Sequence, residues 1–368
     1  MTSPQRFQAL DVFRGMTICF MIIVNTPGND VTFSPLLHAK WHGFTPTDLV
    51  FPSFLFAVGN AMSFVMVKWN TKTQAEVLTK IFKRTALIFL LGYLMYWFPF
   101  FRLDQTGHIT AAPFNETRIL GVLQRIALCY GIAALMIYYL KPKTTLIVSI
   151  VLLFVYWLLM YAFGDYTMLG NAGLKFDLWL MGDKHLYHGE GVAFDPEGWV
   201  STIPAIGNVV AGYIAGQFIQ QKGKTYEGLS KLLLAGFTLF VIAYFWNLSF
   251  PINKKLWTSS FVILTVGLDC MLLAAIIYLI DFKNKTKGVY FFEVIGKNPL
   301  IIYLLSELMA TVLYMIHVGN KNLFSWVYNN IFSYAGDYFG SLFFAISYML
   351  ICWSVGYVMD KKKIYIRV

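Results

Sequence analysis

The feature of this sequence that most limits its fold is a series of ten apolar stretches, each about as long as a membrane-spanning helix. A helix needs about 20 mostly apolar residues to cross the hydrocarbon core of a bilayer. Only 13% of the 368 residues are charged and 58% are hydrophobic, so the chain has too few charges to cover a soluble surface. We therefore expect an all-α, polytopic transmembrane bundle in which residues 1–368 form a single domain. The predicted spans are 8–26, 47–68, 81–101, 119–140, 144–163, 199–220, 229–250, 257–280, 297–317 and 339–359.

The basic residues of the predicted loops indicate how the bundle is oriented, because Lys and Arg concentrate in the cytoplasmic loops of membrane proteins. With both termini in the cytoplasm, 19 of the 29 basic residues fall in inner segments and eight in outer segments. We therefore expect cytoplasmic termini and a multi-pass protein of the cell inner membrane. The same distribution explains the net charge of +10 without a nucleic-acid partner.

Two further segments stand out between the predicted spans. The longest outer loop, residues 164–198, holds six acidic residues, two histidines and Trp179. A loop of this kind is most often a solvated surface, but it also suits a lid that receives a cationic or hydroxyl-rich substrate. Residues 322–335 are aromatic, amphipathic and too short to cross a bilayer, so we expect them at the membrane interface.

Several ionisable residues lie within the predicted spans, where a charge is costly and therefore often functional. Asp11 and Arg14 are three residues apart on the first span, so they share a helix face and can pair. Arg125 lies inside the fourth span and needs an anionic partner, which is either Asp11 or a ligand phosphate. Asp269 and Glu307 stand alone in apolar segments, and their roles stay open.

The densest group of polar residues follows the first span, from Asn25 through His38 and His42 to Asp48 at the start of the second span. Histidine suits a general base because its unperturbed pKa lies near neutrality. Asp48 either complements the dipole of the second helix or orients an imidazole, as in acyl-transfer sites. His38 and His42 are the two candidate bases, although a single loop histidine is more often a surface residue.

Seven blocks of sequence follow one another nearly from end to end of the chain. They are ALDVFRG at 9–15, VN at 24–25, HAKWHGFTPTDLVFPSFLFAVG at 38–59, GVLQRIAL at 121–128, FDPEGWVSTIPAI at 194–206, PINKKLWTSSFV at 251–262 and GKNPLIIYLLSE at 296–307. In this order they resemble the heparan-α-glucosaminide N-acetyltransferase family and its bacterial relatives. That family transfers an acetyl group from cytosolic acetyl-CoA across a membrane to an amino sugar.

The resemblance implies roles for individual residues. His38 matches the active-site histidine of the family, and Asn25 and Asp48 match polar positions of the same site. Asp11, Arg14 and Arg125 match two further blocks, and with Lys297 they become candidates to hold acetyl-CoA, the implied co-substrate.

The resemblance also implies an amino-sugar acceptor, which is glucosamine or a terminal glucosaminide, and a homodimer in the lipid bilayer. The chain has no counterpart of the N-terminal luminal region and additional first span of the lysosomal enzyme, so we expect the bacterial core form. We expect no metal, because the four cysteines fall in apolar runs without ligand spacing.

Two functions therefore fit the sequence. The favoured one is an acetyltransferase whose active-site mouth opens on the outer, periplasmic side, with direct transfer preferred over an acetyl-histidine intermediate. The alternative is a secondary transporter for amino sugars in which the intramembrane charges relay protons. Repeated halves with matching broken helices are common in transporters, and we find no such symmetry in this sequence.

Overall fold

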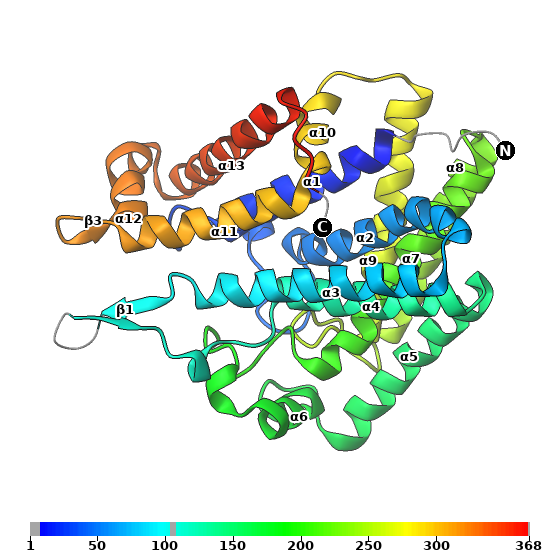
Figure 1. The fold of residues 1–368 in the computed structure, drawn as a ribbon, viewed down its shortest axis with the longest axis horizontal. Helices are drawn as coiled ribbons and strands as arrows, with labels where there is room; N and C mark the ends of the chain where they lie inside the picture. Colours follow the sequence, from blue (N-terminus) through cyan, green and yellow to red (C-terminus); the bar gives the residue numbers. More distant parts are fainter. Residues whose placement is uncertain (1–7, 104–107, 367–368) are drawn as a thin grey trace.

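The computed structural model describes residues 8–103 and 108–366, and most of these residues lie in helices (Figure 1). Short strands form two antiparallel hairpins, β1 (Phe101–Leu103) with β2 (Ile109–Ala111) and β3 (His317–Val318) with β4 (Lys321–Asn322). The long helices are α1 (Gln8–Asn25), α2 (Val50–Met66), α3 (Gln74–Trp97), α4 (Val122–Tyr139), α5 (Pro142–Phe163), α7 (Trp199–Lys222), α8 (Tyr226–Trp246), α9 (Ser259–Ile277), α11 (Pro299–Met315) and α13 (Asp337–Lys361). The shorter ones are α6 (Ala172–Met181), α10 (Val289–Lys297) and α12 (Leu323–Val327).

The predicted all-α polytopic fold is confirmed, and each of the ten predicted spans overlaps one of the long helices. Among the described residues, eight helices are long and apolar enough to cross a membrane, and α10 with α11 make a ninth if the bent pair is one span. The remaining helix, α3, is 24 residues long, but Lys80, Lys83 and Arg84 shorten its apolar part. Residues 322–335 form only short helical turns and no span, as predicted.

The bent pair has a local cause in the sequence. Helices α10 and α11 meet at an angle of 83° around Asn298. Pro299 begins α11 without a backbone N–H to continue the helix before it. Asn298 then holds the C-terminal tail, because its amide donates to Ile364 O at 3.0 Å and accepts from Ile366 N at 2.9 Å. The tail is thereby fixed against the α10–α11 junction.

The centre of the bundle is the contact between α2 and α7, where two glycines allow the backbones to touch. A Cβ on Gly59 would lie 1.9 Å from Val209 O, and a Cβ on Gly212 would lie 2.0 Å from Phe56 O. Small residues at such crossings are a common means of packing helices within a membrane. The approach fixes α2, which carries part of the site described below.

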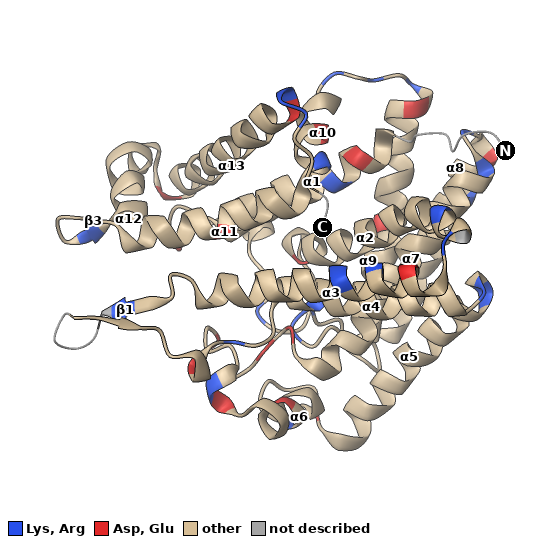
Figure 2. Cartoon of the chain, in the orientation of Figure 1, with Lys and Arg blue, Asp and Glu red and all other residues tan. Residues whose placement is uncertain are grey.

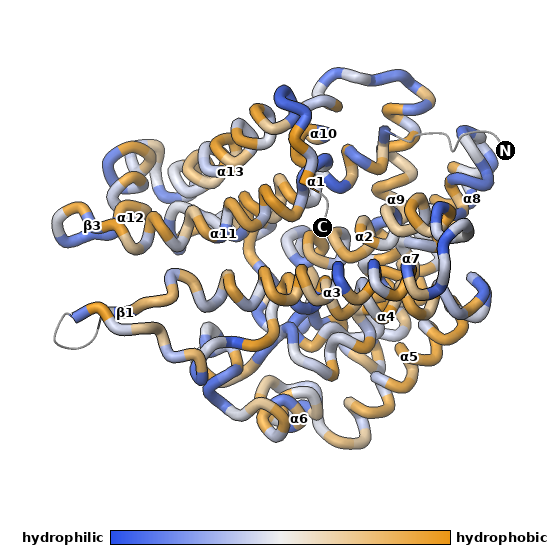
Figure 3. The backbone as a smooth tube through the Cα atoms, in the orientation of Figure 1, coloured by the Kyte–Doolittle hydropathy of each residue, from blue (hydrophilic) through white to orange (hydrophobic). Residues whose placement is uncertain are grey.

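The outer helices present apolar surface instead. Only 22% of the most apolar window of α5, and the same share of α8, is buried within the protein, and hydrophobic residues run along nearly the whole of α5 (Figure 3). Lipid tails would cover such surface. α1 begins and α13 ends at the same end of the bundle (Figure 1), and basic residues gather there (Figure 2). This arrangement agrees with an even number of crossings.

Candidate active site

A cavity of about 350 Å³ lies at the end of the bundle where α1 finishes. It brings together segments from most of the chain, including the predicted site residues His38, Asn25 and Asp48. Residues between 187 and 197, in the long loop before α7, form one wall. The lining residues are Met21, Val24, Asn25, His38, Ala39, Thr47, Asp48, Val50, Phe51, Tyr96, Arg118, Val122, Tyr187, Glu190, Pro196, Glu197, Lys254, Lys255, Tyr303 and Glu307.

His38 and Asp48 form a hydrogen-bonded pair in this cavity. His38 Nδ1 lies 2.7 Å from Asp48 Oδ1, and the Asp48 side chain is 1% exposed, whereas that of His38 is 42% exposed. A carboxylate can only accept, so Nδ1 carries the proton and Nε2 keeps its lone pair. This is the arrangement of a general base held by a carboxylate.

Asp48 owes its position to the start of the second helix. Its Oδ2 accepts from the backbone N–H of Thr45 at 3.0 Å, from the Thr45 hydroxyl at 3.1 Å and from the N–H of Ala39 at 3.1 Å. The Thr45–Asp48 contacts form a capping box at the short helix η2 (Pro46–Leu49), which leads directly into α2. The same carboxylate therefore caps the N-terminus of η2 and orients the neighbouring imidazole of His38.

Asn25 and Glu307 contact each other in the lining of the cavity. Asn25 is the last residue of α1, and its amide nitrogen lies 3.4 Å from Glu307 Oε1 on α11. The sequence left Glu307 without a role, and the structure places it among the lining residues. Asp269, the other residue without a role, instead accepts from Ser53 at 2.5 Å between α2 and α9.

A buried cluster around Arg118 forms another wall. Arg118 donates to Asp195 at 2.9 and 2.7 Å and to Glu197 at 2.7 Å. Its guanidinium also lies over the rings of Tyr96 and Tyr187, at 5.0 and 4.7 Å from their centroids. Glu197 and both tyrosines line the cavity, so the cluster presents carboxylate oxygens and aromatic faces to a ligand.

His42, the other candidate base, lies outside the lining of this cavity. Its Nδ1 lies 3.3 Å from the amide nitrogen of Asn253, on the segment before α9. Two lysines of that segment do reach the cavity. Lys255 pairs with Glu190 at 2.6 Å, and Lys254 Nζ lies 3.1 Å from both ring nitrogens of His38.

A second cavity, of about 560 Å³, lies nearer the beginning of α1 and contains three of the predicted cofactor-binding residues, Asp11, Arg14 and Lys297. Arg14 lies 3.8 Å from Asp11, which confirms the predicted pair, and it donates to Gly296 O at 3.1 Å. Lys297 pairs with Asp360 at 2.8 Å. Arg84 joins them over the ring of Tyr130, at 4.5 Å.

The sequence model of the heparan-alpha-glucosaminide N-acetyltransferase catalytic region matches residues 6–246, well over half of the chain. The chain belongs to this family. Heparan-alpha-glucosaminide N-acetyltransferase from Homo sapiens is 26% identical over 358 residues, covering 82% of this chain and 52% of the human protein. The Mus musculus enzyme of the same name is 27% identical over 367 residues, covering 84% of this chain and 54% of its own length. The chain therefore spans about half the length of these relatives.

Membership of the N-acetyltransferase family makes the position of Arg125 informative, because Arg125 is not among the residues that line either cavity. Its guanidinium is completely buried, contacts the Ser201 hydroxyl, donates to Gly198 O at 3.2 Å and lies 4.8 Å from the ring centroid of Trp257. We expected Asp11 or a phosphate as its partner, and it instead binds the first turn of α7. The other residues predicted to bind acetyl-CoA lie together in the second cavity.

Sequence reasoning missed several residues that line the cavity containing His38. Arg118, Tyr96 and Tyr187 lie outside the blocks that carry the family resemblance, and nothing in their local sequence marks them. Glu197 and Lys254 do lie within two of those blocks, so the signal was present, but their positions beside His38 were not predictable. Among the described residues, no group of three or more His, Cys, Asp or Glu side chains is arranged to hold a metal ion.

Proposed function

We propose that this chain is a transmembrane N-acetyltransferase that moves an acetyl group from acetyl-CoA in the second cavity to an amino sugar in the His38 cavity. The observation that carries this proposal is that α1, α2, α3, α4 and α11 line both cavities, each helix contributing to one cavity near one end and to the other further along. A donor and an acceptor would thus be held in a single bundle, on opposite sides of a thin wall.

The second cavity suits the donor. Arg14, Arg84 and Lys297 offer cationic groups for phosphates, which arginine recognises with particularly good geometry. Beyond them the lining is apolar, with Phe54, Val58 and residues of α4, and such a lining suits a narrow and weakly polar pantetheine arm. Arg125 is not part of this proposed donor site.

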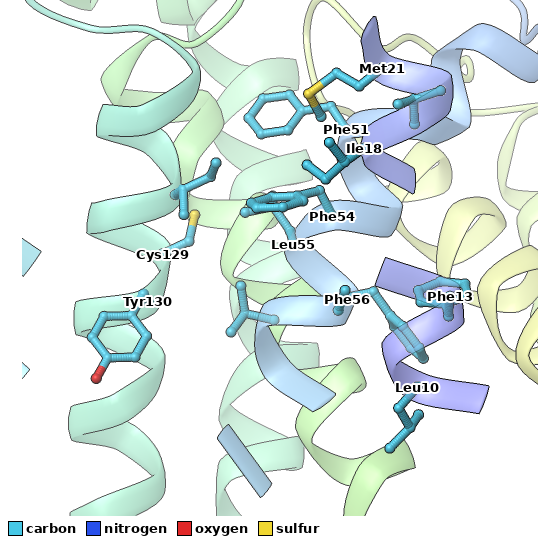
Figure 4. Packing of buried hydrophobic residues seen from close by; sticks show 14 of the residues in the cluster. Leu10, Phe13, Ile18, Met21, Phe51, Phe54, Leu55, Phe56, Cys129 and Tyr130 are labelled. Carbon is cyan, nitrogen blue, oxygen red and sulfur yellow. The ribbon is translucent and has the colours of Figure 1, made fainter. Parts of the chain in front are cut away.

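The wall between the cavities is thin along α2 and α4. Phe51 lines the His38 cavity and Phe54 the donor cavity, so only about 4.5 Å of helix rise separates them. On α4 the corresponding residues, Val122 and Leu123, are consecutive. Figure 4 shows Met21, Ile18, Phe51 and Phe54 between α1, α2 and α4. A thioester that passes these side chains would reach His38.

The chemistry at His38 then follows from its free lone pair. Nε2 accepts a proton from the acceptor amine as the nitrogen–carbon bond forms, and the thioester carbon–sulfur bond breaks to release the CoA thiolate, which takes the proton. General-base catalysis of this kind typically contributes about 10²–10⁴-fold. The Asn25 amide is a donor suited to the oxyanion that develops on the acetyl carbonyl.

The His38 cavity also suits an amino sugar. Glu190, Glu197 and Glu307 supply acceptors for hydroxyl and amino groups, and Tyr96 and Tyr187 supply aromatic faces for a sugar ring. Because Tyr187, Glu190 and Glu197 come from residues 164–198, that loop acts as the predicted lid. We propose glucosamine or a terminal glucosaminide as the acceptor, by analogy with the names of the relatives.

We further propose that the His38 cavity opens to the outer, periplasmic face of the inner membrane and the donor cavity to the cytoplasm. The excess of basic residues at the end of the bundle where α1 begins supports this orientation.

Sealed, inside-out and right-side-out membrane vesicles test the proposed function. With labelled acetyl-CoA on the cytoplasmic face and glucosamine on the other, label should appear on the sugar only when both are present on these sides. Transport of unmodified labelled glucosamine without acetylation would instead favour a transporter. An inactive His38→Ala variant, reconstituted at equal protein content, is the matched control.

A further inference from the structure

Lys254 makes an unusual contact with His38 that the proposed reaction does not yet use. Its side chain comes from the segment between α8 and α9, and Nζ lies 3.1 Å from His38 Nδ1 and 3.1 Å from Nε2. Among the described residues, no carboxylate lies within 4.0 Å of Lys254 to neutralise it, whereas Lys255 is paired with Glu190 at 2.6 Å. The close polar contacts of the ammonium group are therefore with the imidazole, and the carboxylates of Asp48, Glu197 and Glu190 lie farther away but favour its charged form.

The equal distances show where the ammonium group sits. The lone pair of Nε2 points outward in the plane of the ring, away from Nδ1, so an atom lying along it would be much farther from Nδ1 than from Nε2. Nδ1 has no lone pair to offer, because it donates to Asp48. Lys254 Nζ therefore contacts the ring from its face, and the Nε2 lone pair stays open.

We propose that Lys254 is a positioning residue that keeps the imidazole of His38 neutral while leaving Nε2 accessible to the acceptor amine. This inference deepens the proposed function and rests on it for its catalytic meaning. A positive charge against the ring opposes formation of the imidazolium ion, which carries the same charge. Asp48 acts in the opposite sense, because its carboxylate stabilises the imidazolium.

The balance between these neighbours favours the neutral ring. Burial, together with Lys254 and Lys255, lowers the pKa of His38 below 6.5 even though Asp48 raises it. Burial also lowers the pKa of Lys254 to about 8, so the lysine still carries its charge at neutral pH. The other charged groups that face the cavity form pairs of opposite charge, Arg118 with Glu197 at 2.7 Å and Lys255 with Glu190. Glu307 is outside these pairs and lies beside Asn25.

Lys254 would also help to reset the base. Once His38 has taken the proton from the amine, two positive groups face each other, and the proton is more readily passed on. It goes to the sulfur of the departing thiolate, so the ring N–H bond breaks as the S–H bond forms. Lys254 itself gains and loses no proton in this step.

Diethyl pyrocarbonate tests the proposal, because it modifies only the neutral form of an imidazole at the free nitrogen. The rate of His38 modification is measured by peptide mass spectrometry in the wild type, in Lys254→Met and in Lys254→Arg. The pH is varied from about 4.5 to about 8, because this range brackets the ordinary histidine pKa. His317, which is exposed on β3, serves as the internal reference in every sample. The assay needs neither acetyl-CoA nor sugar, so its outcome is independent of whether the vesicle assay succeeds.

We expect Lys254→Met to raise the midpoint of His38 modification by about one pH unit, which makes modification about tenfold slower at pH values below both midpoints. Lys254→Arg, which keeps the charge, should stay near the wild type, and Lys255→Met should give a smaller shift because Glu190 already offsets Lys255. If Lys254→Met does not fold, Lys254→Gln provides a second neutral variant. An unchanged or lower midpoint in a folded neutral variant would overturn the proposal.

Discussion

Individual side chains of the site combine structural and chemical tasks, and Asp48 is the clearest case. Its two carboxylate oxygens accept from His38, Ala39 and Thr45, so one residue caps η2 and orients the imidazole. These contacts satisfy the ring N–H of His38 and the backbone N–H groups of Ala39 and Thr45 together. A substitution of Asp48 therefore tests the chemistry of His38 only if the backbone around η2 keeps its conformation.

His38→Ala should reduce acetyl transfer by about 10²-fold or more, because it removes the proton acceptor. His42→Ala should have a mild effect, since His42 does not line the cavity. In the wild type, kcat/KM should fall on the acid side with a midpoint below 6.5, because the lowered pKa keeps His38 neutral to lower pH than an ordinary histidine. An essential His42 and a dispensable His38 would contradict the assignment of the base.

Arg14→Gln should raise the KM for acetyl-CoA by about tenfold, the loss expected for a charged hydrogen bond to phosphate. Arg125→Met serves as the control. Its folded fraction should have the same KM for acetyl-CoA as the wild type, because Arg125 is buried against Gly198 and Ser201. Isothermal titration with CoA provides the same comparison without turnover. A lower CoA affinity in folded Arg125→Met would return Arg125 to the donor site.

At the scale of elements, the start of α7 is held in place by side chains from two other helices. Arg125 binds Gly198 O and Ser201, and Asp177 on α6 accepts from Trp199 N at 3.0 Å. These contacts hold the first turn of α7 against α4 and α6, and the wall formed by Asp195 and Glu197 comes directly before that turn. The geometry of the His38 cavity therefore depends on this helix start.

Asp177→Asn should change how stability depends on pH. Burial raises the pKa of Asp177 to about 7, so the folded protein binds this proton more tightly than the unfolded chain does. Stability from this group is present below pH 3.8 and is lost as the pH rises towards 7. Between pH 5 and pH 8 the melting temperature of the wild type should therefore fall more than that of Asp177→Asn. Scanning fluorimetry in detergent measures both. Parallel curves would show that Asp177 does not bind the proton in this way.

At the scale of the whole molecule, two cavities share five helices and almost meet at Phe51 and Phe54. In the proposed function this arrangement would place a donor and an acceptor close together without a carrier between them, and proximity of that kind is a large part of many catalytic rates. The wall would then have to admit a thioester while the membrane stays closed to larger solutes. The expected homodimer remains a prediction, which cross-linking in membranes can check.

Direct transfer predicts a ternary complex, so initial-rate plots for acetyl-CoA and glucosamine should intersect. An acetyl group resting on His38 would instead give parallel, ping-pong lines. We prefer direct transfer because an acyl-imidazole in a cavity open to water is prone to hydrolysis. Stoichiometric label on His38 from acetyl-CoA alone, transferred afterwards to added sugar, would reverse this preference.

The orientation has its own test. A reporter fused after Val368 should read cytoplasmic, and a reporter inserted near His188 should read external, because basic residues favour the cytoplasmic side. The latter position lies in the exposed part of the long loop, where the His188 side chain is 53% exposed. Two reporters on the same side would contradict the proposed count of crossings.

The sequence by itself predicted the helices and their approximate limits, and it indicated that Asp48 could orient a nearby histidine such as His38 and that Asp11 could pair with Arg14. These properties are local, because insertion depends on about 20 consecutive apolar residues and both pairs lie within ten residues along the chain. Only the tertiary structure placed Lys254, 216 residues away, against His38 and turned Arg125 towards α7. Those contacts depend on how helices approach one another, as at Gly59 and Gly212, and a single sequence does not encode that geometry in any local pattern.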